Sequence, residues 1–248
     1  MTEPGYYGHP IGKPPVWTWE VPLYFFVGGA SGMSAVVALT SLVGGVSLEL
    51  AETALWIALV GALLSPVLLI LDLGRPLRFL NMLRVFKLRS PMSVGAWTLI
   101  AFGGFCSVSV VLFEGFALLV ELFELPSELL SGLLWASMLG AATTGAILAT
   151  YTGVLLGATA IPAWAAHRSV LPVHFGAAGL GSAIALIEIF DRHVDALGLV
   201  AIVVSLVETV LFGIAEAKRR GIVERALRRG RAATLVRVAS ALTGPISL

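Results

Sequence analysis

Long apolar runs, broken by short polar connectors, make up most of the sequence. A helix needs about 20 apolar residues to cross a bilayer, and the runs reach or approach that length, so they predict about six membrane-spanning helices. The predicted spans are residues 19–44, 51–72, 93–118, 129–156, 173–190 and 197–216. The pattern therefore predicts an all-α protein that folds as a polytopic membrane helical bundle.

The composition supports the same class. Hydrophobic residues make up 58% of the 248 residues, charged residues only 12%, and the mean hydropathy is +0.94. A soluble domain cannot remove so much apolar surface from water. We divide the chain into a polar N-terminal segment (residues 1–18), a transmembrane domain (19–216) and a basic amphipathic tail (217–248). The tail is expected to lie on a membrane surface or against a protein, not on nucleic acid, and the N-terminal segment lacks the apolar core of a removable signal peptide.

The cations fall almost entirely on one side of the predicted bundle. We call the side that holds the N-terminus side A and the opposite side B. With alternating spans, side A carries all but one of the 16 Lys and Arg residues, and side B carries Arg192 alone. Basic connectors are retained in the cytoplasm. The distribution therefore predicts a multi-pass protein of a bacterial or archaeal cytoplasmic (inner) membrane, with both termini in the cytoplasm.

The most basic connector follows the second span. It has the sequence LDLGRPLRFLNMLRVFKLRSPMS (residues 71–93), and we call it the basic connector. Its cations are Arg75, Arg78, Arg84, Lys87 and Arg89. The positive-inside rule explains them as a retention signal.

Polar side chains are predicted to gather at one depth near side A, where the first span begins, the second and fourth end and the fifth begins. Glu20 and Tyr24 are four residues apart and share a helix face. The other members of this group are Trp17, Asp72, Arg75, Tyr151 and His174.

Simpler roles exist for each of these residues. Trp17 could belong to an aromatic belt at the interface, and Arg75 could be a snorkelling cation. His174 could be a satisfied interfacial histidine. Asp72 could cap its helix or pair with Arg75. A carboxylate at this depth is costly unless it is paired or hydrated, so Glu20 and Asp72 are the strongest functional candidates.

Glu208 lies deeper, roughly 17 Å into the sixth span at 1.5 Å per residue. An isolated carboxylate near the membrane midplane is a candidate for moving protons or ions. A hydrogen bond to a Ser or Thr of another helix is the structural alternative.

The sequence contains few cysteines and histidines that could bind a metal. The single cysteine, Cys106, cannot hold an iron–sulfur cluster or form a disulfide within the chain. A b-type haem needs two facing histidines within the helices, and only His174 lies near a span. We therefore expect no intrinsic haem, iron–sulfur cluster or other metal.

Three ordered motifs are similar to those of one membrane protein family. They are PPVWTWEVPLYFFVGGASG, DLGRPLRFLNMLRVFKLRSPMSVGAW and YTGVLLGATAIPAW. They resemble the NrfD / polysulfide reductase membrane-subunit family (NrfD/PsrC-like) over most of the chain. The resemblance implies a quinone site, for menaquinone or ubiquinone, at the partner-facing end of the first four-helix bundle. It also implies a ferredoxin-like iron–sulfur subunit as partner, with a molybdopterin-type catalytic subunit beyond it.

The family motifs can be carried over only in part. Tyr151 matches a family tyrosine that lines the quinone pocket. Tyr24 stands where the polysulfide reductase has a histidine, and Val21 where it has an asparagine, so Glu20 is the nearest polar substitute. Family members usually have more spans than this chain. The resemblance therefore implies an intact first four-helix bundle and an incomplete second bundle. Either another membrane subunit completes the second bundle, or the chain is a truncated form.

The sequence thus favours a quinone-reactive membrane subunit of a multi-subunit respiratory oxidoreductase. Tyr151 would hydrogen-bond a quinone oxygen, and Glu20 or Asp72 would relay protons. Arg75 would favour ionised Asp72, and Trp17, Tyr24 and His174 would help to line the site. Two alternatives remain, namely a non-catalytic anchor or assembly subunit and a proton conduit centred on Glu208. The rest of the basic connector would form the docking surface for the iron–sulfur subunit.

Overall fold

The computed structural model describes residues 18–72, 78–159, 162–165, 167–190 and 195–218. Every regular element in these ranges is a helix. The helices are α1 (Glu20–Gly44), α2 (Leu48–Asp72), α3 (Arg78–Leu83), α4 (Pro91–Phe123), α5 (Ser127–Gly157), α6 (Pro162–Ala165), α7 (Leu171–Phe190) and α8 (Asp195–Lys218). The predicted all-α class is confirmed.

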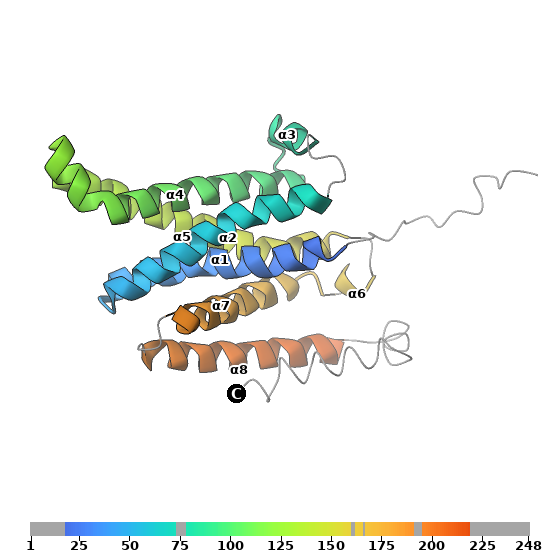
Figure 1. Cartoon of the computed structure of the whole chain (residues 1–248). Coiled ribbons are helices and arrows are strands. Elements are labelled where there is room, and N and C mark those ends of the chain that lie inside the picture. Colours follow the sequence, from blue (N-terminus) through green and yellow to red (C-terminus); the bar gives the residue numbers. More distant parts are fainter. Residues whose placement is uncertain (1–17, 73–77, 160–161, 166, 191–194, 219–248) are drawn as a thin grey trace, which may run out of the picture.

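The six long helices alternate in direction. The first residues of α1, α4 and α7 and the last residues of α2, α5 and α8 lie at one end of the bundle, on the right of Figure 1. This end corresponds to side A. It also carries the short helices α3 and α6, and the hairpin between α4 and α5 projects furthest at the opposite end (Figure 1).

Five of these helices (α1, α2, α4, α5 and α7) are long and apolar enough to cross a membrane. The apolar section of α8, Leu197–Leu211, is shorter. Each predicted span falls within one long helix except the first, which begins one residue early. The structure therefore confirms a polytopic helical membrane protein.

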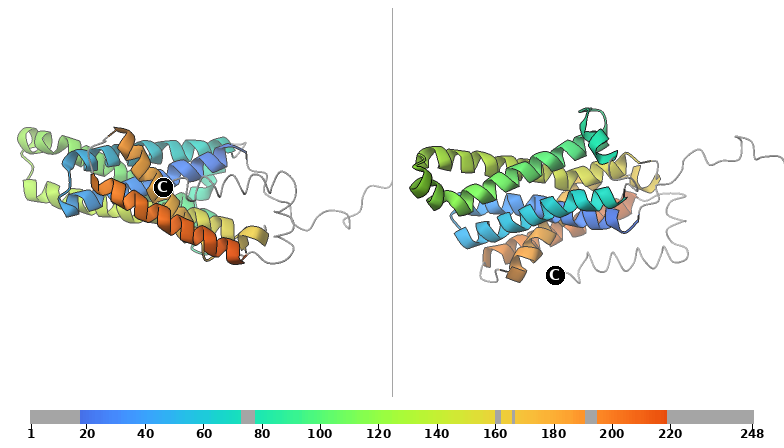
Figure 2. Two further views of the ribbon diagram at one scale, coloured as in Figure 1. Left: turned by 90° about the horizontal axis from the view of Figure 1, so that it is seen from below. Right: turned by 45° about the horizontal axis from the view of Figure 1, so that its top comes forward.

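Helix α1 lies at the centre of the arrangement. It packs against α2, α5 and α7, while α4 packs against α2 and α5 and completes a four-helix group. Helix α7 lies between this group and α8, as Figures 1 and 2 show. The core of the group includes Phe102, Cys106 and Leu148, all fully buried.

Glycines let the central helices approach closely. A side chain at Gly32 of α1 would collide with the backbone of Gly145 of α5, and a side chain at Gly145 would collide with Gly32. A side chain at Gly179 of α7 would also collide with the backbone of Gly29 of α1. Small residues at helix crossings maximise packing where the bilayer supplies no hydrophobic driving force.

The start of α4 holds the basic connector in place. Ser90 caps the helix by accepting a hydrogen bond from the Ser93 amide, and Pro91 occupies the first turn, where no backbone donor is needed. The Ser93 hydroxyl donates to the carbonyl of Val85 (3.2 Å) and accepts from the amide of Lys87 (3.0 Å). The SPMS motif therefore ties the end of the connector to the bundle.

Candidate functional site

Two buried tyrosines lie near each other inside the four-helix group, toward the end that corresponds to side A. Tyr24 of α1 is 4% exposed and Tyr151 of α5 is 7% exposed. They lie close enough to interact electrostatically. No hydrogen bond joins either hydroxyl to any residue that the structure describes. Two phenol donors are therefore available at one place in the interior.

A glycine lies beside each tyrosine ring. The ring of Tyr151 lies where a side chain at Gly95 of α4 would have to be. A methyl group placed on Gly28 would contact the ring of Tyr24 at 3.4 Å and the hydroxyl of Ser65 at 3.7 Å. The four helices α1, α2, α4 and α5 therefore all contribute to the surroundings of the tyrosine pair.

Ser65 of α2 adds a third hydroxyl near this site. Its oxygen is fully buried and has no hydrogen-bond partner among the described residues. The next residue, Pro66, lies inside α2 and has no amide hydrogen to give to the preceding turn. This part of α2 therefore carries unused hydrogen-bonding capacity, which is unusual in a bundle interior.

Glu20 is the first residue of α1 and lies one helical turn before Tyr24. It is partly buried, and its Oε2 atom is buried with no hydrogen-bond partner among the described residues. Asp72, at the end of α2, is exposed and accepts a hydrogen bond of 3.1 Å from the Thr18 hydroxyl. One carboxylate thus faces the interior, and the other lies at the surface.

His174 of α7 lies apart from the tyrosine pair. Its ring contacts Phe175 (6.3 Å between centroids), Phe175 contacts Phe25 (6.0 Å), and Phe25 contacts Tyr24 (5.8 Å). Two phenylalanine rings therefore lie between the histidine and Tyr24. Its Nδ1 atom is buried without a hydrogen-bond partner in the described chain. The other predicted site residues near side A, Trp17 and Arg75, lie outside the described residues.

Glu208 occupies a different part of the molecule. Its Oε1 atom lies beside Gly181 of α7, at 3.8 Å from where a methyl group on that glycine would be. It is therefore at the contact between α7 and α8, whereas the tyrosine pair is inside the four-helix group. Among the described residues, no group of three or more His, Cys, Asp or Glu side chains could hold a metal ion.

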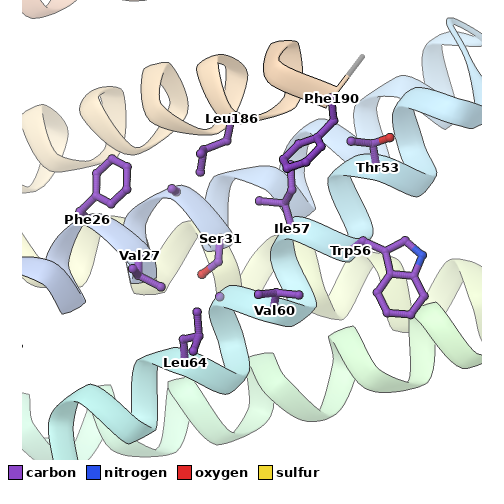
Figure 3. A pocket seen from close by; sticks show the side chains of 12 residues that line it. Phe26, Val27, Ser31, Thr53, Trp56, Ile57, Val60, Leu64, Leu186 and Phe190 are labelled. Carbon is purple, nitrogen blue, oxygen red and sulfur yellow. The ribbon is translucent and has the colours of Figure 1, made fainter.

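A groove of about 470 Å³ lies on the outer side of the α1–α2 crossing (Figure 3). Its walls come from α1, α2 and α7, and Phe26, Trp56, Leu64 and Phe190 are among the lining residues. Two of the three lining side chains that can donate, Trp56 and Ser31, already do so, and Thr53 is the exception. The Trp56 indole donates to Glu114 Oε1 (2.9 Å), and the Ser31 hydroxyl donates to the carbonyl of Gly28 (3.2 Å).

This groove suits hydrocarbon better than a polar ring. A quinone headgroup needs hydrogen-bond donors for its two carbonyl oxygens, and the groove offers few that are free. The tyrosine pair offers two. Ser31 of α1 and Gly61 of α2 pack so tightly that a side chain at Gly61 would collide with Ser31. This contact at the α1–α2 crossing separates the groove from the tyrosine pair.

Sequence reasoning did not single out Ser65 or Gly95. Ser65 was detectable as a hydroxyl that precedes a proline within an apolar run. Gly95 carries no such signal, because its role depends on the ring of Tyr151 packing against it from another helix.

Comparison with known proteins agrees with the fold and the motifs. The family model described as "Polysulphide reductase, NrfD" matches residues 10–213. No curated protein and no solved structure matches the chain. The matched residues cover α1 through most of α8, including both tyrosines and the SPMS motif. The chain therefore belongs to the NrfD polysulphide reductase family, whose members are membrane subunits of quinone-interacting oxidoreductases.

Proposed function

We propose that this chain is the quinone-reactive membrane subunit of a respiratory oxidoreductase complex. It exchanges electrons between a quinone pool, of menaquinone or ubiquinone, and a ferredoxin-like iron–sulfur subunit, with a molybdopterin-type catalytic subunit beyond that. The observation that carries the proposal is the proximity of Tyr24 and Tyr151, two buried side chains whose hydroxyls bond no residue that the structure describes.

The residues present fit a quinone headgroup. A quinone has two carbonyl oxygens that accept hydrogen bonds, and the tyrosines supply two hydroxyl donors from α1 and α5. Glu20 and Ser65 supply two further buried oxygens without partners among the described residues. Buried polar groups in proteins are normally hydrogen-bonded, so several unsatisfied groups near one end of a bundle support a polar ligand there.

Each side chain has a distinct part in this proposal. A bound quinone supplies chemistry that couples two electrons to two protons. Tyr24 and Tyr151 orient it by donating hydrogen bonds. Glu20 holds and transfers protons on the interior side, because its carboxylate lies one turn from Tyr24. Asp72, which is exposed beside Thr18, exchanges protons with water at the end of the bundle.

The basic connector is the proposed docking surface for the iron–sulfur subunit. Arg84, Lys87 and Arg89 are all exposed, and the Ser93 hydrogen bonds hold their segment against α4. Helix α3 and the start of α4 lie at the same end of the bundle as the start of α1 and the end of α5, the helices that carry Tyr24 and Tyr151 (Figure 1). A partner bound there would be near the quinone site, and acidic groups on that partner would complement the cations.

The cation distribution predicts that this end faces the cytoplasm. A reporter enzyme that is active only in the periplasm, fused after Leu248, is expected to give background activity, because basic segments are retained inside. A second reporter that is active only in the cytoplasm should give a strong signal at the same position. The reverse pattern would place the connector, and with it the iron–sulfur subunit, outside the cytoplasm.

Glu20→Gln is expected to slow quinone turnover by about 10²-fold or more, the usual range for loss of a positioned acid–base group. The amide keeps the shape of the side chain but cannot carry a proton. The solvent deuterium isotope effect on turnover should therefore rise, while the KM for a soluble quinone analogue stays nearly constant. Both quantities can be measured on the purified complex with an artificial electron donor.

Glu114→Gln is the matched control for this experiment. Glu114 also belongs to a spanning helix, but it accepts a hydrogen bond from Trp56, a contact that glutamine can keep. Its turnover should equal that of the parent. Parental turnover and isotope effect in Glu20→Gln as well would rule out Glu20 as the proton carrier.

A further inference from the structure

The groove at the α1–α2 crossing runs along the depth of the membrane. On α2 its lining extends from Thr53 to Leu64, roughly 17 Å at 1.5 Å per residue. Figure 3 shows Thr53, Ile57, Val60 and Leu64 following one another along this length. Thr53 lies near the start of α2, at the side B end, and Phe190, the last residue of α7, also lines the groove there. The groove therefore reaches from the side B end to about the middle of the bilayer.

The walls of the groove are open to the surroundings of the bundle. Trp56, Val60 and Leu64 of α2 and Phe26 of α1 line it, and each is between 45% and 50% exposed. The Trp56 ring is held from α4, because its indole nitrogen donates to Glu114 Oε1 (2.9 Å). A molecule in the membrane can therefore enter the groove from the side, without separating the helices.

The size of the groove favours a hydrocarbon chain over a protein helix. Its volume is about 470 Å³. A helix about 10 Å across would need roughly 1,300 Å³ over the same 17 Å. One leaflet of the hydrocarbon core is about 15 Å thick, half of the usual 30 Å. The groove therefore matches one acyl chain of a lipid in the side B leaflet, and a helix of another chain could not enter it.

Polar side chains at the side B end of the groove select the headgroup. Glu49 is four residues before Thr53 and continues the same stripe of α2 toward the membrane surface, and Glu52 is next to Thr53. Both carboxylates are exposed, and every Lys and Arg that the structure describes belongs to the side A end. The Thr53 hydroxyl bonds no described residue, so it can donate to an ester or phosphate oxygen. The carboxylates attract an ammonium group and repel an anionic headgroup.

We propose that the groove holds an acyl chain of an amine-bearing phospholipid of the ethanolamine class from the side B leaflet, with its ammonium group beside Glu49 and Glu52. Charge complementarity distinguishes this lipid from phosphatidylglycerol and cardiolipin, which are anionic and have no ammonium group. The same carboxylates disfavour a free fatty acid. The proposal is independent of whether Tyr24 and Tyr151 bind a quinone.

Two other occupants would have to reach the groove from side A. The headgroup of a quinone at the tyrosine pair is separated from the groove by the contact between Ser31 and Gly61, so its isoprenoid tail is a poorer occupant. The basic tail of this chain (217–248) begins where α8 ends, at side A (Figure 1). Its many Lys and Arg residues would be uncompensated in an apolar groove.

Photoreactive lipids of two headgroup classes test the proposal. The full chain, purified with the subunits that accompany it, is reconstituted into vesicles. These contain either a phosphatidylethanolamine with a diazirine on one acyl chain or a phosphatidylglycerol with the same chain, and mass spectrometry locates the adducts. The ethanolamine probe should label residues 26–31 and 53–64 about three- to tenfold more than the glycerol probe, the effect of two exposed ion pairs.

Variants on α2 separate the headgroup from the chain. Glu49→Gln combined with Glu52→Gln should make the two probes label these residues equally. Val60→Trp should fill the groove and lower labelling by both probes about fivefold or more. Val108→Trp is the matched control, because Val108 of α4 is 48% exposed, against 50% for Val60, and does not line the groove. If Val60→Trp fails to accumulate, the glutamine pair still decides, since it changes only exposed side chains.

Three results would contradict the proposal. Equal labelling of the parent chain by the two probes would make the groove an unselective lipid surface. Adducts on other helices but none in the groove, with either probe, would show that a protein segment fills it. Loss of the ethanolamine adduct when excess menaquinone or ubiquinone is added would assign the groove to the quinone tail.

Discussion

Replacement of both Tyr24 and Tyr151 by phenylalanine is expected to slow quinone turnover by about 5- to 150-fold. Each hydroxyl contributes one hydrogen bond, worth about 0.5–1.5 kcal/mol, and the two together give about 1–3 kcal/mol. Either single variant should show a smaller loss. The measurement is steady-state turnover of the purified complex with a soluble quinone analogue.

The double variant should still assemble, because the tyrosine rings provide the packing at this site and only the hydroxyls are removed. The rings fill the spaces beside Gly28 and Gly95, and phenylalanine fills them equally well. Neither hydroxyl bonds a described residue, so its removal leaves no broken pair within that part of the chain. Abundance of the chain in membranes and co-purification of the other subunits should remain at the parental level.

Thr150→Val is the control for the loss of a hydroxyl in the same region. Thr150 is one residue from Tyr151, and its hydroxyl donates to the carbonyl of Ala146 (2.9 Å) within α5. Its removal should leave turnover unchanged. If the tyrosine double variant also turns over at the parental rate, the quinone does not bind at this pair, and the proposed site is wrong.

The helices themselves could be predicted from the sequence because the bilayer imposes a minimum apolar length. The predicted 51–72 corresponds to α2 at Leu48–Asp72, and the predicted 173–190 corresponds to α7 at Leu171–Phe190. The largest difference between a predicted span and its helix is at the end of α4, which continues to Phe123, whereas the predicted span ends at residue 118. Hydropathy marks the part of a helix that lies in lipid, and a helix can continue past it.

The candidate site could be predicted only in part. Depth follows from residue number, so the sequence predicts that Glu20, Tyr24, Asp72 and Tyr151 lie near one end of the bundle. In the structure α1 begins at that end, and α2 and α5 finish there (Figure 1). Which of them meet depends on helix rotation and neighbours. The structure brings the two tyrosines together and puts Phe25 and Phe175 between Tyr24 and His174.

The same limit applies to the glycines. Glycine at any of these positions allows membrane helices to pack closely. The sequence alone could not show that Gly32 meets Gly145 while Gly103 and Gly104 meet open space. That distinction depends on which face of each helix is buried.

Gly145→Ala is expected to destabilise the bundle by about 1–3 kcal/mol, the usual cost of adding atoms to a tightly packed interior. The added methyl group would collide with the backbone of Gly32, and its distance to the Cα atom would be 2.9 Å. A backbone cannot rotate aside as a long side chain can, so α1 and α5 must separate. The midpoint of thermal unfolding of the purified chain in detergent should fall.

Gly104→Ala is the matched control, because it makes the same chemical change in a spanning helix where nothing lies within 4 Å of the new methyl group. Alanine favours the helix over glycine by roughly 0.5–1 kcal/mol, so this variant should be as stable as the parent or more stable. The glycine contact also sets the spacing of the helices that carry Tyr24 and Tyr151. Gly145→Ala should therefore slow quinone turnover even at temperatures where the chain stays folded. Equal stability of the two variants would show that α1 and α5 do not meet at these glycines, and the arrangement of the tyrosine pair would lose its support.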